Sequence, residues 1–522
     1  MYLCYDIRGI QSFVFQIPRL RYIIGGSALV DRFDRVTVPG LAARDGWTFI
    51  SAGGGKGTFA CGHSSDADKI QATLIEEVHA FCADIRFGRH DEYSEAAHCA
   101  DRLFPYLPKN LEGHPCSESG LYPVAGDDVH EIVNRRNWSR GDKLGRWFED
   151  RLLAKNSIVL MPGLPADKLA FMRDVETEPG TYALGGRNRW AVICMDGNDM
   201  GSQFGAMKAK ANGQDMIAWV QAMSRALDTC SEKACLAGIQ RVVKEWSGEE
   251  RTGALIQNER CHDDSGALVL PVRPLVVGGD DIAVLCHAGY AATFVREACK
   301  AFEEESRSLA TEAKKKGIAL WPATGDHITI SAGILYCGTS LPLATAIPYA
   351  EKLLAMAKRK GRALKTGREV APSPACVEFE AVTESMLDEP QTRRERELFF
   401  VDGDLGTELV ELTCRPYSLE GFGDLLDELG KLSLPGSILH QLLPSLRAGY
   451  HDRRVFRWRL GKHQAALASA LAEDEDQPGE FPSGSRWKRK GSAETGWTRY
   501  TDVVDLALLA QESRRMIQED AQ

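Results

Sequence analysis

The feature that most constrains this sequence is an internal repeat, because two segments of different sequence share one order of elements. Each begins with a short apolar run that ends in an aspartate: residues 2–6 end in Asp6, and residues 190–196 end in Asp196. Both runs predict buried strands. Each segment continues with a strand, a glycine-rich turn, a second strand and an amphipathic helix. The sequence therefore predicts two domains of the same fold.

The two glycine-rich turns differ where chemistry would take place. The first hairpin (residues 53–56) reads Gly-Gly-Gly-Lys, and the second hairpin (residues 278–281) reads Gly-Gly-Asp-Asp. In both segments a cysteine follows eight residues after the first glycine. Glycine-rich turns are common in proteins that do no chemistry at them, so the hairpins are weighed together with the preceding strands. We expect one catalytic copy and one silent copy.

The second segment carries three aspartates that the predicted fold brings together. Asp196 ends one strand, while Asp280 and Asp281 lie at the tip of the hairpin. If the strands are neighbours, three carboxylates converge, and such a set suits Mg²⁺ or Mn²⁺. Two such ions can activate a hydroxyl and stabilise a departing pyrophosphate, which implies a nucleoside triphosphate as substrate. Gly278 and Gly279 lack a Cβ and would let the backbone approach a base or phosphate.

A helix following Pro348 offers a basic residue for the triphosphate. Its apolar side carries Leu353, Leu354 and Ala357, and Lys358 lies at the border of that side. Lys358 is therefore a candidate phosphate ligand, although charged helix faces are often only solvated. The first hairpin does not form a Walker phosphate loop, because Lys56 is followed by glycine instead of Ser or Thr.

At these residues the sequence resembles a known family, the large polymerase-like subunit of type III CRISPR effector complexes, which has two palm domains. Six segments carry the resemblance: 6–15, 25–27, 196–201, 278–281, 350–358 and 377–379. The small-residue turn at 25–27 adds Ser27 to the candidate nucleotide-binding residues. In that family the first palm is silent, as Gly55 and Lys56 suggest here. The family's usual Asp-Gly-Asp-Asn strand motif is changed, since Asn198 and Asp199 reverse the last two types.

The resemblance implies an α+β fold with two ferredoxin-like palm domains and a helical C-terminal domain. It also implies conversion of ATP to cyclic oligoadenylate, a second messenger in antiviral defence that a downstream effector reads. No His-Asp pair precedes Asp6, so we expect the family's nuclease domain to be absent, and a zinc knuckle between the palms is missing too. We therefore expect a stand-alone synthase, with a CRISPR-complex subunit as the competing interpretation.

We expect four domains or linking segments along the chain. Residues 1–105 form a silent first palm, residues 106–184 a connector, residues 185–382 the second palm, and residues 383–522 a helical domain. The helical prediction rests on apolar residues spaced three and four apart, at Leu405, Leu409 and Leu412 and again within residues 422–432. Opposite charge blocks near residues 473–497 predict a mobile loop, which could also touch RNA.

Composition limits the partners of this chain. Its 63 basic and 73 acidic residues give a net charge of −10, so any contact with RNA must be a local patch. No apolar stretch is long enough to cross a membrane. Fourteen cysteines without a C-x-x-C pair fit core thiols in a reduced cytoplasm better than a zinc site. We therefore expect a cytoplasmic protein that makes its product without added guide RNA.

Three classes of function remain open at this point. The first is the cyclic oligonucleotide synthase. The second is an enzyme similar to diguanylate cyclases, which would favour GTP and need two catalytic chains facing each other. The third is a non-enzymatic scaffold of a CRISPR-like complex, which binds nucleotide or RNA. The duplication favours the first over the second, and the intact Asp280 and Asp281 argue against the third.

Overall fold

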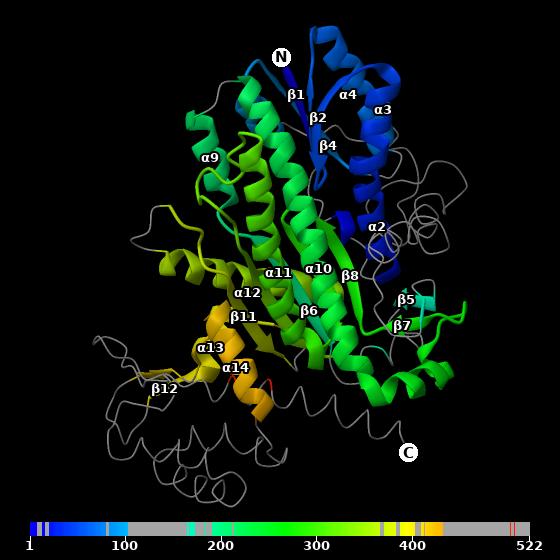
Figure 1. Cartoon of the computed structure of the whole chain (residues 1–522), viewed down its shortest axis with the longest axis vertical. Helices are drawn as coiled ribbons and strands as arrows, with labels where there is room; N and C mark the ends of the chain where they lie inside the picture. The colour runs from blue at the N-terminus through cyan, green and yellow to red at the C-terminus, as the bar shows by residue number, and fades with distance from the viewer. Residues whose placement is uncertain are drawn as a thin grey trace, which may run out of the picture.

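The computed structural model describes most of the two repeats and part of the C-terminal region (Figure 1). The described residues are 1–7, 13–15, 20–79, 83–102, 164–165, 168–172, 183, 190–210, 213–365, 370–382, 387–401, 409–411, 413–431, 502 and 506. Most of the expected connector at 106–184 lies outside them, and so does the charged loop expected at 473–497. Within the described part, no helix is both long enough and apolar enough to span a membrane.

The first repeat, residues 1–102, is a four-stranded antiparallel sheet in the order β2-β3-β1-β4. Its strands are β1 (Tyr2–Ile7), β2 (Thr48–Gly53), β3 (Lys56–Ala60) and β4 (Ile85–His90). Its helices are α2 (Leu20–Arg32), the π-helix η1 (Phe33–Thr37), α3 (Val38–Asp45), α4 (Ser64–His79) and α5 (Tyr93–Arg102). The order of these elements is the β-α-β-β-α-β order of a ferredoxin-like domain.

The second repeat, residues 190–381, has the same order of elements in a six-stranded sheet, β14-β11-β10-β6-β9-β8. Its strands are β6 (Trp190–Gly197), β8 (Val272–Gly278), β9 (Asp281–His287), β10 (Ile330–Cys337) and β11 (Cys376–Ala381), and β14 (Tyr417–Ser418) from the C-terminal region joins them. Its helices are α9 (Met200–Lys210), α10 (Gly213–Gln257), α11 (Ala288–Lys315) and α12 (Leu343–Leu364). The α+β fold with two ferredoxin-like units is confirmed.

The repeat extends to the way in which a helix packs on the fourth strand of each sheet. A Cβ on Gly88 of β4 would lie 2.0 Å from the carbonyl oxygen of Ala96 in α5. A Cβ on Gly333 of β10 would lie 2.4 Å from the carbonyl oxygen of Ala350 in α12. Because no side chain fits at either position, each helix backbone rests directly on its strand. The duplication therefore holds in tertiary structure as well as in the order of elements.

The buried strand β6 separates two hydrophobic cores. Alternate residues point to opposite faces of a strand, and here one set packs toward α10 and α11, which run side by side (Figure 1). The other set, with Val192 at its centre, packs with α12 and with the core of the first repeat. Because one core contains residues of both repeats, the two sheets are fixed relative to each other.

The C-terminal region differs in part from the expectation of a helical domain. Helices α13 (Pro390–Leu398) and α14 (Leu419–Lys431) are present, and α14 matches the helix predicted at 422–432. The prediction at Leu409 is wrong, because this residue begins the short strand β13 (Leu409–Glu411), which pairs with β12 (Phe399–Val401). Cross-strand pairing there overrides the three-to-four spacing of the leucines.

Two further short strands, β5 (Leu169–Phe171) and β7 (Leu268–Leu270), pair in parallel beside the second repeat, next to the 3-10 turn η3 (Glu259–Cys261).

Candidate active site

The two hairpins have equivalent places in the two sheets. In the first repeat Gly53 pairs with Lys56 across the turn, and in the second Gly278 pairs with Asp281. Gly54 and Gly279 both have a φ of 59°, a conformation in which a residue with a side chain is strained. Gly54 and Gly279 are therefore required by the turns, whatever else they do.

The residue that faces each hairpin is also equivalent. Asp6 of β1 is opposite Lys56 of β3, and Asp196 of β6 is opposite Asp281 of β9. In the first repeat an acid meets a base, with 3.7 Å between the Asp6 carboxylate and Lys56 Nζ. In the second repeat an acid meets an acid. The first repeat thus carries its own counter-charge, while the second repeat concentrates negative charge.

The negative charge around the second hairpin changes the proton affinity of its carboxyl groups. Asp281 is exposed at the cavity wall, but the protein around its carboxyl group and the neighbouring carboxylates of Asp280 and Asp196 raise its pKa to about 8. Burial and the charge of Asp196 also raise the pKa of Asp280, to about 6. Asp280 is close to the end of β6, because its backbone oxygen accepts from the N–H of Gly197 at 3.2 Å. The hairpin and β6 therefore bring the carboxyl groups of Asp196, Asp280 and Asp281 together, with too little positive charge nearby to neutralise them.

Lys358 of α12 is the nearest counter-charge. Its Nζ donates to Oδ2 of Asp196 at 2.6 Å. On the same helix Leu353, Leu354 and Ala357 are buried and Lys352 is exposed, so Lys358 lies at the border as predicted. Among the described residues, no three His, Cys, Asp or Glu side chains are already grouped as a metal cage. The Lys358 ammonium group therefore neutralises part of the negative charge at Asp196.

A cavity of about 620 Å³ lies between the two repeats and is lined by both hairpins. This volume is in the usual range for small-molecule sites. Its walls carry three cationic side chains and seven carboxylates. The cations are Arg35, Lys56 and Lys358, and the acids are Asp6, Asp31, Asp34, Asp196, Asp228, Asp281 and Glu351. Acidic side chains thus outnumber basic ones around the cavity.

The structure brings most of the candidate residues to this cavity. Asp196, Asp281, Gly278, Lys358 and Ser27 all line it. Ser27 is a buried residue of α2, so the turn expected at 25–27 is wrong, and these residues are helical. Gly279 and Asp280 form the turn just beside it and are absent from its lining. Candidate residues from both repeats therefore surround the same cavity.

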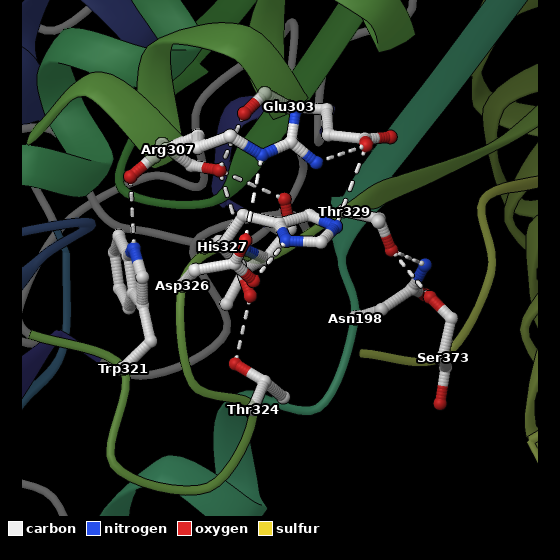
Figure 2. A network of polar contacts seen from close by, with 11 residues as sticks. Asn198, Glu303, Arg307, Trp321, Thr324, Asp326, His327, Thr329 and Ser373 are labelled. Atoms are coloured by element: carbon white, nitrogen blue, oxygen red, sulfur yellow. Dashed lines mark hydrogen bonds and ion pairs between the residues drawn. The ribbon is translucent and has the colours of Figure 1, made fainter. Parts of the chain in front are cut away.

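Asn198 and Asp199 face away from the cavity and hold the end of the sheet. The Asn198 side chain donates to Thr329 Oγ1 at 2.8 Å, and Thr329 in turn donates to the carbonyl oxygen of Ser373 (Figure 2). Asp199 has a φ of 63° and accepts from the Ser373 N–H at 2.6 Å, with Lys365 Nζ at 3.4 Å. Both side chains are thus engaged in structure, and neither is among the residues that line the cavity.

Several polar residues at the cavity were not found from the sequence. Asp34 and Arg35 of η1, Asp228 of α10 and Glu351 of α12 all line it. Asp34 is 3% exposed and accepts from the hydroxyl of Tyr5 at 3.0 Å. The only sequence signal is one acid and one base at helical spacing, Asp31 and Arg35, and such a pair is common on solvated helix faces. Their placement depends on how the two repeats dock, which no local pattern contains.

Comparison with known proteins gives two kinds of similarity and one negative result. Csm1 in T. onnurineus is 16% identical, with 98% of this chain and 69% of that chain covered and a TM-score of 0.48. A Csm1-Csm4 cassette in complex with cA3 is 14% identical, with the same coverage and a TM-score of 0.47, and the same values hold for the cassette in complex with one ATP. No match was found among curated proteins.

The family comparison bears on the second repeat. The model of the second palm domain of Cas10/Cmr2 matches residues 189–364, which run from the start of β6 to the end of α12. This stretch holds the second hairpin, the strand ending in Asp196 and the helix carrying Lys358. The resemblance drawn from these motifs is therefore confirmed for this part of the chain. Residues 189–364 are a second palm domain of the Cas10/Cmr2 family.

Proposed function

We propose that this chain is a metal-dependent nucleotidyltransferase that joins ATP into a cyclic oligoadenylate. The observation that carries the proposal is the pairing of Asp196 with Asp281 at the wall of a cavity that both hairpins line. Two carboxylates held side by side cost free energy, and proteins tolerate this where the charges hold a cation or substrate. The match of residues 189–364 to a palm domain supports the same reaction class.

The charge of the cavity supports a divalent cation as a required partner. A nucleoside triphosphate is a polyanion, and it would be repelled by a wall with seven carboxylates and three cations. Carboxylate oxygens are the ligands that Mg²⁺ and Mn²⁺ prefer, so the donor set fits these ions. Asp196, Asp280 and Asp281 would hold them. When bound, such ions lower the pKa of an attacking hydroxyl and neutralise charge on a leaving pyrophosphate.

The residues of this chain then have distinct tasks. Lys358, at the border of α12, would leave Asp196 and bind a phosphate oxygen, because its flexible side chain lines the cavity that would hold the triphosphate. Gly278 presents backbone without a side chain to the cavity, which lets a base or phosphate come close. Ser27 offers a hydroxyl from the first repeat. In the reaction the 3′ oxygen of one nucleotide bonds the α-phosphorus of another, pyrophosphate leaves, and the hydroxyl proton passes to solvent.

We place this activity in antiviral defence of the type III CRISPR kind, with an effector that reads the product downstream. The Cas10/Cmr2 domain supports this setting, and CRISPR-complex subunits or RNA are the partners that it suggests. None of the twelve cysteines in the described residues forms a disulfide, which favours the reduced cytoplasm as the compartment. The net charge of −10 favours a synthase that does not itself grip guide RNA over a large surface.

Product analysis tests the proposal and separates it from its alternatives. Purified protein is incubated with each nucleoside triphosphate and Mg²⁺ or Mn²⁺, and the products are identified by mass spectrometry. A cyclic adenylate product supports the proposal, whereas cyclic diguanylate supports the cyclase alternative. Nucleotide binding without any product supports the scaffold. A parallel sample treated with RNase decides whether co-purified RNA is needed, because a synthase of the stand-alone type keeps its activity.

A further inference from the structure

The turn of the second hairpin is held by α10 through both polar groups of one glycine. Oδ1 of Asp228 accepts from the N–H of Gly279 at 2.9 Å. The hydroxyl of Ser231, less than one turn further along the helix, donates to the carbonyl oxygen of Gly279 at 2.6 Å. Gly279 immediately precedes Asp280, so these two hydrogen bonds set where the paired aspartates lie.

The first repeat reaches the same oxygen atom. Nη2 of Arg35 lies 3.0 Å from Oδ1 of Asp228, the atom that also accepts from Gly279. The guanidinium uses its other nitrogens for Asp31 at 2.7 Å and Glu232 at 3.6 Å. A single cation thus holds three carboxylates, and without it Asp228 would face two like charges. The position of Asp228 therefore depends on the first repeat.

The residue before Arg35 holds the other hairpin. Oδ2 of Asp34 accepts from the N–H of Gly55 at 2.6 Å, as Asp228 accepts from Gly279. Asp34 is 3% exposed, and the hydroxyl of Tyr5 fixes its second oxygen. Two neighbouring residues therefore connect to the two equivalent turns, one directly and one through Asp228.

The local backbone explains how adjacent residues reach different hairpins. Asp34 and Arg35 lie in η1, a single π-helical turn (Phe33–Thr37) between α2 and α3. Successive side chains on a helix point in different directions, and single π-helical turns are frequent at functional sites. Helix α10 passes both hairpins as well, because Ser224 Oγ lies 3.8 Å from the place of a Cβ on Gly53.

We infer that Asp34 and Arg35 set the position of the two hairpins relative to each other across the cavity, and that Arg35 is a positioning residue for Asp280 and Asp281. The silent repeat would then contribute by holding the catalytic turn in place. The inference about catalysis rests on the proposed function, but the inference about the hairpin does not. It concerns hydrogen bonds and motion of the turn, which can be measured without any product.

Hydrogen exchange of the hairpin tests the positional part. We compare wild type with Arg35→Gln and Arg35→Lys, and use Lys233→Gln as the matched control, because Lys233 is on α10 but pairs with Glu305 at 2.8 Å. Arg35→Gln is expected to speed exchange about fivefold in the peptide containing Gly279, with the rest of the second repeat unchanged. Arg35→Lys keeps the positive charge but loses the planar guanidinium that contacts several carboxylates at once. Its exchange rate is therefore expected to lie between those of wild type and Arg35→Gln. Lys233→Gln leaves the hairpin rate at the wild-type value.

Kinetics test the catalytic part on the same proteins. Because displacement of the aspartates by about 1 Å slows chemistry more than binding, Arg35→Gln is expected to lower kcat about tenfold or more with KM within about twofold. Asp228→Asn keeps the size of the side chain and serves as the second variant if Arg35→Gln does not fold. The double variant Arg35→Gln with Asp228→Asn is expected to lose no more than the worse single variant, because both act on one atom.

The outcomes separate this inference from the proposed function. Hairpin exchange that is unchanged in Arg35→Gln, or raised equally throughout the chain, overturns the positioning role. Additive losses in the double variant also overturn it. A wild-type protein that makes no nucleotide product contradicts the proposed function alone, and the exchange experiment then still decides whether Arg35 holds the turn.

Discussion

Lys358 lies with its Nζ 2.6 Å from Oδ2 of Asp196, so that a lysine neutralises one member of a pair of facing aspartates. The same two strand positions in the first repeat are occupied by Asp6 and Lys56. In one repeat the base is therefore built into the hairpin, and in the other it comes from helix α12. This difference motivates the predictions below.

Removal of the lysine should weaken nucleotide binding. We expect Lys358→Ala to raise KM for the triphosphate about tenfold, since a charge-assisted contact to phosphate is lost, and to leave Mn²⁺ binding unchanged or stronger, since a competing cation is gone. Steady-state kinetics and calorimetric Mn²⁺ titration measure the two effects. Lys352→Ala is the control, because Lys352 is on the same helix but pairs with Glu389 at 2.5 Å. A wild-type KM in Lys358→Ala would contradict the phosphate role.

Removal of the acids should abolish the reaction but not the fold. The double variant Asp280→Ala with Asp281→Ala, and Asp196→Ala separately, are expected to lose at least about 100-fold in product formation. The melting temperature is expected not to fall for the double variant, because repulsion between like charges is relieved. Product assays and thermal unfolding check both statements. Lys56→Ala in the first hairpin is expected to leave the chemistry largely unchanged, and an equally severe loss there would mean that the repeats are assigned wrongly.

Metal binding should strengthen as pH rises. The protein around the Asp281 carboxyl group and the carboxylates of Asp280 and Asp196 raise its pKa to about 8, so at neutral pH this group keeps a proton that a metal must displace. Between pH 6 and 8 the Mn²⁺ dissociation constant is therefore expected to fall by up to about tenfold per pH unit. Calorimetry at pH 6, 7 and 8 measures the trend. Asp281→Asn should flatten it, and a flat profile in wild type would show that Asp281 does not compete with a proton.

Asp34 should make the protein less stable as pH rises from acid to neutral. Burial, partly offset by hydrogen bonds from Gly55 and Tyr5, raises the pKa of Asp34 to about 7 from its ordinary value of 3.8. Between these values the folded state binds more proton than the unfolded state, so the free energy of unfolding falls with rising pH, by at most about 1.4 kcal/mol per pH unit. Above about pH 7 this contribution is constant.

The asparagine variant isolates this effect. In Asp34→Asn the side-chain oxygen can still accept from the N–H of Gly55, but the side chain cannot ionise. The stability of the variant relative to wild type is therefore expected to increase from pH 5 to pH 7. Urea unfolding at both pH values measures the difference, and equal differences at the two values would show that Asp34 does not ionise in this range.

Much of the fold was predictable because its signals are local. Apolar runs, glycine pairs and amphipathic stretches indicated β1, β6, both hairpins and α12, and the order of elements indicated a duplication. The strand at Leu409 was missed, since the leucine spacing there is helical but pairing with a partner strand decides the structure. The long α10, with its break at Gly248, was not predicted either.

The sequence by itself determined which residue types stand at the two turns, and therefore that one repeat carries Asp280 and Asp281 where the other carries Gly55 and Lys56. Only the tertiary structure decided which groups surround them. Asp34 and Arg35 are adjacent to each other in the chain but about 190 residues or more from Asp228 and the second hairpin. Their contacts exist because two sheets share one core and face one cavity. Long-range docking of this kind produces no periodic pattern in the sequence, because it depends on how whole domains pack.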